Sequence, residues 1–546
     1  MARSTSAPFV VVAMLVLVVV AVVALLPSVV DGRRALDGFR GRPKPTIYNK
    51  PAPIRQAHRG SSRARGAPPA DLAQQVLSNM DFSVDPCQDF YQYACGSWLQ
   101  SFELPADRAR YSLSSDGIAD ANEQVLLDIL QDESGSWPLV GPFYDSCMDQ
   151  ATIDARGLAP LNAMVARLGA PSNDPTTVLA QVGGVLHRYG IPGLFAMFVA
   201  VDSLHPEAMQ VQLDQGGLGL YTPSDYTDSD VVNQYLTYMS SMFQLAGDSQ
   251  STAQSNARLV LSVESALANA SYSNVERRDP YLLIHPYNVS TLASTFGGNS
   301  KAWNAYLVAV GLPPISDARW VGDQFNVNVP PFFHAIFDTV LKMPAQTIYT
   351  YLRWCIINDL SQLLPSSFVQ ESFEFYGAFL NGQEEITPRW RTCVQATDEN
   401  LGELLGRYFV ADKFPAASKS LAQELVKEVE LAFLSNLPGV DWMDNKTRAL
   451  SAQKLSMVDN LIGYPAHWTD YTSLCLVKSE YFESTLATRN LTVTNMLQQM
   501  FKPVDKEKWE MTPPTGTHTY TDRETILCLS LSLSLSLSLS IYPLSS

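Results

Sequence analysis

The sequence predicts a mainly α-helical protein, in which a large multi-helix domain carries one small β-hairpin. Several segments after residue 70 repeat apolar residues with a period near 3.6, which is the spacing of one face of a helix. One pair of apolar segments, 195–201 and 209–213, flanks a turn at 203–207 and predicts the hairpin. With 546 residues, 46% of them apolar, the chain can bury a large core and more than one folded unit.

The N-terminus predicts export. Residues 9–26 form an uninterrupted apolar run, which is at the lower limit for spanning a bilayer and longer than a typical signal-peptide core. We therefore expect residues 1–30 to hold a cytoplasmic stub and a signal-anchor, or a signal peptide. Residues 31–70 are rich in Arg and Pro and poor in apolar residues, so we expect a basic stem. A solvated linker is the favoured interpretation of this stem, and attraction to lipid headgroups is the alternative.

A helix is predicted to begin at Asp85, which can cap it, with Pro86 at the first helical position and Gly96 as the stop. On such a helix Cys87 and Cys95 are separated by roughly 12 Å, whereas a disulfide needs Cα atoms within about 7 Å. The two thiols are therefore not expected to bond to each other. Each has a distant partner, or both are buried free cysteines.

Further helices are predicted along the chain from caps and apolar periodicity. Asn122 is the expected cap of an apolar run at 125–130, and Ser420 with Gln423 forms a capping-box pattern. Residues 351–364 and 447–462 carry apolar stripes at helical spacing.

Six segments resemble, in order, the neprilysin and endothelin-converting-enzyme family of zinc metalloendopeptidases. They are DPCQDFYQYACGSWL (85–99), FYDSCM (143–148), LDQGGLGL (213–220), ERRD (276–279), PRWRTC (388–393) and WMD with IGYP (442–465). The resemblance covers residues 78–515. It implies the family's N-terminal helical domain at 71–465 and an incomplete start of its catalytic domain at 466–515.

The sequence lacks the family's zinc motif. In H-E-x-x-H, two imidazoles four residues apart on a helix bind zinc and the Glu is the general base. No two of the seven histidines here are four residues apart. We therefore predict no catalytic residue, no metal ligand and no bound cofactor in this chain, and expect it to be inactive by itself. The alternative function is a membrane-tethered, non-catalytic module that binds peptides or other partners.

The end of the chain departs from the family. Residues 529–540 alternate strictly between Leu and Ser, which is typical of low complexity. We expect residues 516–546 to be an aberrant tail, translated from an alternative or wrongly assigned 3′ end, on a chain truncated before the zinc site.

The resemblance implies roles for particular residues. Cys147 and Cys393 lie in matching segments and are expected to form a disulfide. Arg110 matches an arginine that family members offer to a peptide carboxylate or carbonyl; the alternative is an exposed arginine in a surface salt bridge. The usual partners of Cys87 and Cys95 lie in the catalytic domain, so both cysteines are expected to be unpaired and to promote disulfide-linked oligomers.

Charge and sequons complete the expectations. The net charge of −16 argues against nucleic acid as a partner. The family resemblance implies peptides as the expected ligands. The resemblance favours a single-pass type II plasma-membrane protein, tethered through residues 9–26 with its domain outside the cell; secretion is the alternative. Glycosylation sequons stand at Asn269, Asn288, Asn445 and Asn490, although Asn445 could serve instead as a helix cap.

Overall fold

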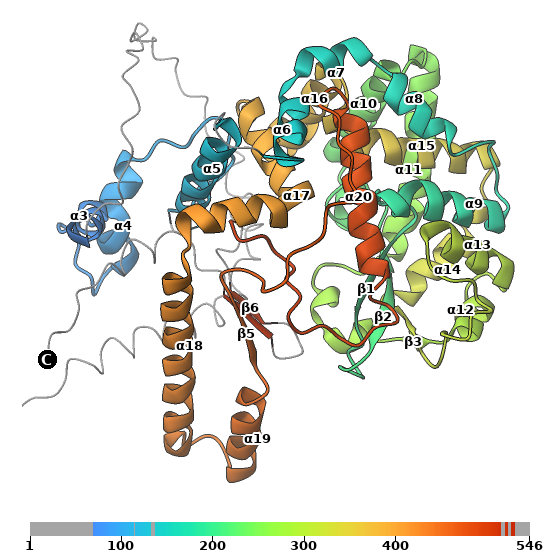
Figure 1. Ribbon diagram of the computed structural model, residues 1–546. Helices are drawn as coiled ribbons and strands as arrows, with labels where there is room; N and C mark the ends of the chain where they lie inside the picture. The colour runs from blue at the N-terminus through green and yellow to red at the C-terminus, as the bar shows by residue number, and fades with distance from the viewer. Residues whose placement is uncertain (1–68, 114, 133–136, 515–518, 522–525, 530–546) are drawn as a thin grey trace, which may run out of the picture. The chain divides into compact units, whose positions relative to one another are not determined.

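The computed structural model describes residues 69–113, 115–132, 137–514, 519–521 and 526–529 (Figure 1). All of these residues belong to one unit, Gly66–Ser546. Within them, no helix combines the length and the apolar character needed to cross a bilayer. The predicted anchor at residues 9–26 and the stem up to residue 68 lie outside the described residues.

The predicted fold class is confirmed, because helices make up most of the described chain. The α-helices are α3 (Pro69–Asn79), α4 (Phe90–Ser101), α5 (Asp116–Gln131), α6 (Val140–Met148), α7 (Gln150–Arg156), α8 (Ala159–Ala166), α9 (Pro175–Gln181), α10 (Ser229–Leu245), α11 (Gln250–Ala270), α12 (Val289–Thr295), α13 (Ser300–Val310), α14 (Pro330–Asp338), α15 (Ala345–Asp359), α16 (Ser366–Ser372), α17 (Arg389–Lys413), α18 (Ala416–Asn436), α19 (Asn445–Leu455) and α20 (Tyr481–Leu497).

Short helical turns connect these helices. Two are π-helical, η1 (Val182–Leu186) and η8 (Phe373–Leu380). The others are 3₁₀ turns: η2 (His187–Tyr189), η3 (Pro223–Thr227), η4 (Glu276–Arg278), η5 (Pro280–Leu283), η6 (Val340–Lys342), η7 (Ser361–Leu363) and η9 (Leu437–Gly439).

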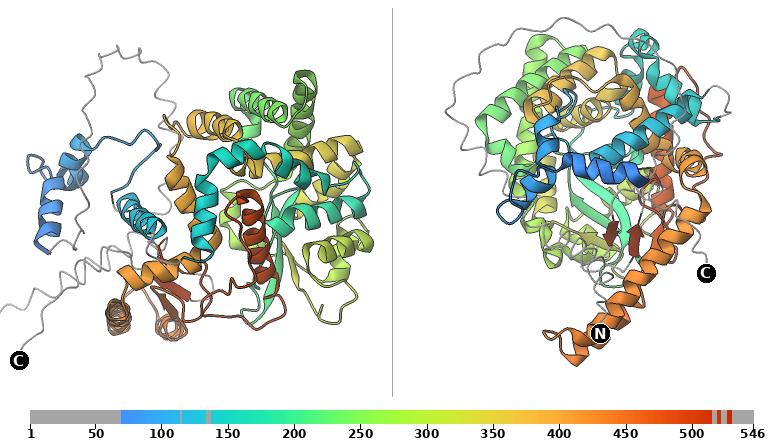
Figure 2. Two further views of the ribbon diagram at one scale, coloured as in Figure 1. Left: turned by 45° about the horizontal axis from the view of Figure 1, so that its top comes forward. Right: turned by 90° about the vertical axis from the view of Figure 1, so that its left-hand side faces the viewer.

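The predicted hairpin is present and extends into a small sheet. Strands β1 (Phe195–Val201) and β2 (Met209–Gln215) pair antiparallel, with Phe195 opposite Gln215 and Val201 opposite Met209. Strand β4 (Phe325–Val327) runs parallel to β2, and β3 (Pro286–Tyr287) pairs antiparallel with β4. Helix α20, drawn in red, packs against β1, α6 and α17 (Figure 2).

A second sheet forms from the end of the described chain. Strand β5 (Asp459–Ile462) pairs in parallel with β7 (Ile526–Leu529), which pairs antiparallel with β6 (Thr519–Thr521). Two segments of the expected low-complexity tail are therefore described as strands. The rest of its Leu-Ser alternation lies outside the described residues.

A buried carboxylate ties the glycine-rich loop after β2 to the helical core. Glu264 of α11 accepts hydrogen bonds from the hydroxyls of Tyr226 (2.8 Å) and Tyr235 (3.1 Å). Burial raises the pKa of Glu264 from 4.5 to about 7. A Cβ atom at Gly219 would collide with the Tyr235 hydroxyl, so the loop approaches this cluster closely only with glycine there.

The predicted helix start at Asp85 is wrong. Helix α4 begins at Phe90, and its cap is Asp89, whose side chain accepts a hydrogen bond from the Gln92 backbone N–H (2.9 Å). Asp85 instead closes a turn by accepting from the Cys87 backbone N–H (2.8 Å). Cys87 therefore precedes the helix that contains Cys95, and the separation calculated along one continuous helix does not apply.

Three other predicted boundaries also differ. Asn122 lies inside α5 rather than at its start, because its side chain is buried against a distant segment. Ser420 lies inside α18, where its hydroxyl donates to the Ala416 carbonyl (3.1 Å). The predicted helix over 447–462 ends at Leu455, and its last four residues form β5, because pairing with β7 satisfies their backbone groups.

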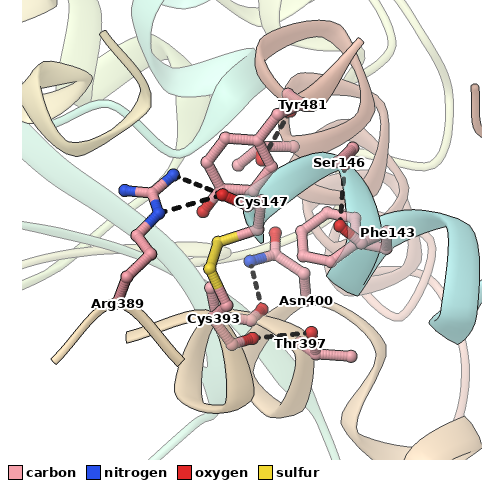
Figure 3. Close-up of a disulfide and its surroundings, with 10 residues drawn as sticks. Phe143, Ser146, Cys147, Arg389, Cys393, Thr397, Asn400 and Tyr481 are labelled. Atoms are coloured by element: carbon pink, nitrogen blue, oxygen red, sulfur yellow. Dashed lines mark hydrogen bonds between the residues drawn. A yellow bond between two sulfur atoms is a disulfide. The ribbon is translucent and has the colours of Figure 1, made fainter. Parts of the chain in front are cut away.

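The Cys147–Cys393 disulfide is confirmed, with Cα atoms 5.6 Å apart (Figure 3). It joins the last turn of α6 to the second turn of α17, and both cysteines are fully buried. The Arg389 guanidinium reinforces this junction, since its Nε and Nη2 atoms donate to the Cys147 carbonyl at 2.9 and 2.6 Å. Tyr481 of α20 packs against Phe143 with ring centroids 5.6 Å apart. The disulfide therefore fixes the first turns of α17, which carry the site described next.

Candidate functional site

A cavity of about 580 Å³ opens between α5, α17 and Pro514. Helical spacing brings its lining residues to one face of each helix. Helix α5 contributes Asp116, Ala119, Asn122, Glu123 and Leu126, helix α17 contributes Val394, Gln395 and Asp398, and residues 110–112 form the edge before α5.

Two arginines and their carboxylate partners hold one wall of this cavity. Arg391 of α17 pairs with Asp107 (Nη1 to Oδ2, 2.5 Å) and with Glu123 (Nε to Oε2, 3.0 Å). Arg108 pairs with Asp120 of α5. These half-buried ion pairs link α17, α5 and the segment before α5. Both guanidiniums therefore have carboxylate partners.

Arg110, which the sequence singled out, lies at the edge of this cavity. Its side chain is exposed, and it forms no ion pair or hydrogen bond with any residue that the structure describes. The alternative of a surface salt bridge therefore has no support among the described residues. A free guanidinium offers a planar fork of donors, which fits a carboxylate or two carbonyl oxygens.

Two buried polar side chains at the cavity were not predicted. Asn122 is 2% exposed and donates through Nδ2 to the Pro514 carbonyl (2.8 Å). Asp398 is 6% exposed and accepts through Oδ2 from the Thr512 hydroxyl (2.8 Å). The Oδ1 atoms of both residues are buried and have no hydrogen-bond partner among the described residues. No local pattern marks these two residues, because their burial depends on a segment more than one hundred residues away in sequence.

Burial changes the acidity of Asp398. Removal from water raises the pKa of its carboxyl from 3.8 to about 7, although the hydrogen bond from Thr512 favours the charged form. The charged neighbour that acts on it is Glu399, a like charge. Helix α17 departs from helical geometry at Leu401 (φ −132°, ψ 29°), one turn beyond Asp398.

The described histidines do not form a metal site. Within the described ranges, no three His, Cys, Asp or Glu side chains are grouped so that they could hold a metal ion. His187 is buried with both ring nitrogens in use, toward the Tyr306 hydroxyl (2.8 Å) and the Gly193 carbonyl (3.1 Å), and burial lowers its pKa to about 4. It therefore supports the core as a neutral ring.

The sequons lie in different environments. Asn269 and Asn445 are exposed, and Asn288 caps α12 by accepting from the Thr291 N–H (2.9 Å). Asn445 is not a cap, since Asp444 fills that role at the start of α19. Asn490 lies inside α20, and its buried Oδ1 atom has no hydrogen-bond partner in the part of the chain that the structure describes.

Four cysteines of the described chain are not in disulfides. Cys87 and Cys475 are exposed, Cys95 is half-buried and Cys355 is buried. The expected oligomers through Cys87 and Cys95 stay a prediction.

Comparisons with known proteins agree with this fold. A family model described as Peptidase family M13 matches residues 86–465. Endothelin-converting enzyme 1 of Rattus norvegicus is 27% identical over 471 residues, which cover 81% of this chain and 60% of that protein. Neprilysin-3 of Drosophila melanogaster is 26% identical over 481 residues, which cover 82% and 60%. The crystal structure of the Mycobacterium tuberculosis zinc metalloprotease Zmp1 with an inhibitor superposes with a TM-score of 0.77 at 25% identity, covering 86% of this chain and 70% of that one.

These matches show that the chain is similar to endothelin-converting enzymes and neprilysins. The chain belongs to peptidase family M13. It spans about 60% of the length of the curated relatives that it matches.

Proposed function

We propose that this chain binds peptides in the cavity between α5 and α17, where Arg110 holds a carboxylate or a backbone carbonyl of the peptide. The observation that supports the proposal most strongly is the free guanidinium of Arg110 beside a cavity of about 580 Å³. Charge-assisted hydrogen bonds from a guanidinium to a carboxylate are roughly twice as strong as neutral ones. Relatives named as converting enzymes and metalloproteases make a peptide the most plausible ligand.

We further propose that the chain does not hydrolyse peptides by itself. Metal-assisted hydrolysis needs an activated water and a polarised carbonyl. The sequence has no histidine pair at the spacing of H-E-x-x-H, and the described residues offer no cluster that fits zinc. The residues present therefore do not fit zinc, the metal of the Zmp1 protease, and no step of a mechanism is assigned to it. This chain's part is to bind and orient the peptide.

A membrane-tethered binding module with no catalytic role would use the same surface. In that arrangement the predicted anchor at residues 9–26 holds the helical domain outside the cell, with glycans on the exposed sequons. Peptides are the partner in either case.

Isothermal titration with a short peptide that has a free carboxyl terminus tests the binding proposal. Arg110→Ala should weaken binding about tenfold, because one charged hydrogen-bonding group is lost. Arg258→Ala is the matched control, since Arg258 is an exposed arginine of α11 outside the cavity. Equal affinities of the wild type and the Arg110 variant would overturn the assignment of Arg110.

Mass spectrometry of the peptide after long incubation tests the second part. We expect the peptide to remain intact with and without added zinc or a chelator. Cleavage that zinc supports and a chelator abolishes would contradict the proposal.

A further inference from the structure

Two residues that line the cavity each carry a buried oxygen atom that no described residue satisfies. Asn122 Oδ1 and Asp398 Oδ1 belong to lining residues on opposite helices, and each side chain is more than nine-tenths buried. Buried polar atoms in folded proteins are almost always hydrogen-bonded, and an unsatisfied one costs about 1–3 kcal/mol. Two such acceptors at one cavity indicate a ligand that brings hydrogen-bond donors.

The charges around the cavity favour a cationic donor. Asp398 has no cationic partner within ion-pair distance among the described residues, whereas Glu123 is paired with Arg391. Of the other charged residues nearby, Arg110 at the cavity edge is cationic, whereas Asp116 on α5 and Glu399 on the same helix as Asp398 are acidic. An uncompensated buried carboxylate is costly, and an opposite charge in the cavity would remove that cost.

We propose that this cavity receives a cationic group of the bound peptide, with Asp398 as its counter-ion and Asn122 Oδ1 as a second acceptor. The group is a lysine or arginine side chain, or the amino terminus of the peptide, since all three present N–H donors around a positive charge. The inference rests on the proposed function, because it assumes that the peptide held by Arg110 enters the same cavity. Arg110 would then bind a negatively charged group of the peptide, and Asp398 would bind a positively charged group of the same peptide.

Three synthetic peptides separate the sources of the charge: an acetylated pentapeptide with a central lysine, its norleucine analogue, and the norleucine peptide with a free amino terminus. All three keep the free carboxyl terminus for Arg110. We expect the lysine peptide, or the one with the free amino terminus, to bind about tenfold more tightly than the acetylated norleucine peptide. Asp398→Asn should remove this preference. Glu399→Gln, which neutralises the neighbouring exposed carboxylate, should keep it.

Proton release gives a second measurement on the unchanged protein. The free Asp398 carboxyl is mostly protonated at pH 6, because its pKa is about 7, and a bound cation favours its ionised form. Binding of the cationic peptide that shows the preference should therefore release close to one proton at pH 6 and few at pH 8. Calorimetry in buffers of different ionisation enthalpy counts these protons. The other groups that face Asp398 are the carboxylates of Glu399, Asp116 and Glu123, the guanidiniums of Arg391 and Arg110 and the Tyr471 hydroxyl, whose pKa burial raises to about 12.

The outcomes distinguish the two proposals. Equal binding of all three peptides, weakened by Arg110→Ala and accompanied by no proton release, would overturn the cationic site and leave the proposed function standing. Binding of none of the peptides would overturn both.

Discussion

Removing the Cys147–Cys393 disulfide should greatly reduce the stability of the helical domain. The two cysteines are 246 residues apart, so the bond closes a loop that contains most of the described helices. The chain-entropy relation gives an upper value of roughly 5.5 kcal/mol at 25 °C for a loop of this length. Native disulfides commonly contribute about 2–5 kcal/mol, so we expect the Cys147→Ala/Cys393→Ala variant to lose about 3–5 kcal/mol.

Urea unfolding followed by tryptophan fluorescence measures this loss. Wild-type protein unfolded with a reductant present keeps the two sulfur atoms and loses the bond alone, so it separates cross-linking from packing. Cys355→Ala is the matched packing control, because Cys355 is also buried but is not in a disulfide. We expect that control to lose about 1 kcal/mol. Unfolding free energies within about 1 kcal/mol of one another for oxidised and reduced wild type would refute the entropic account.

Three further predictions follow from buried groups. Gly402→Ala should destabilise the fold by about 1–3 kcal/mol in thermal unfolding, because the new Cβ would collide with Thr512 Cγ2; an unchanged melting temperature would contradict this contact. The raised pKa of Glu264 means that its protonated form stabilises the fold, a contribution complete below pH 4.5 and lost as the pH rises through about 7. The unfolding free energy should therefore fall by at most roughly 3 kcal/mol between pH 5 and pH 8. Glu264→Gln should make the unfolding free energy depend less on pH, and an identical pH dependence in the variant would refute the assignment to Glu264. A thiol reagent should modify Cys87 in the folded protein and spare Cys355, whose pKa burial raises strongly; peptide mapping that finds both modified at equal rates would contradict the burial of Cys355.

Local patterns in the sequence predicted the elements whose structure depends on near neighbours. The hairpin of β1 and β2 formed as expected, because its apolar strands and its turn lie within about twenty residues. The predicted start of α4 is four residues too early. Asp85 and Asp89 are the same residue type and are equally suitable as caps, but only the Asp89 side chain accepts a hydrogen bond from a backbone N–H of the helix, that of Gln92. Gly96 did not end that helix, because it packs inside it against Asp81.

The candidate site was predictable in part. The resemblance singled out Arg110, which the structure places at the cavity edge. Asn122 was expected to be a helix cap, yet its side chain bonds to the Pro514 carbonyl, 392 residues away. The burial of Asp398 depends in the same way on Thr512, 114 residues away. Contacts of this range leave no periodic or local signal in the sequence, so the structure was needed to find the acceptors in the cavity.

Hydrogen–deuterium exchange of the full chain with and without the acetylated lysine peptide tests the central claim most directly. If the peptide occupies the cavity between α5 and α17, exchange should slow in residues 108–126 and 391–400, and Arg110→Ala should reduce this protection at a peptide concentration near the wild-type dissociation constant. Helix α11, far from the cavity in sequence and outside its lining, should exchange at an unchanged rate. Protection confined to other segments, or protection that persists in full in the Arg110 variant, would contradict the claim.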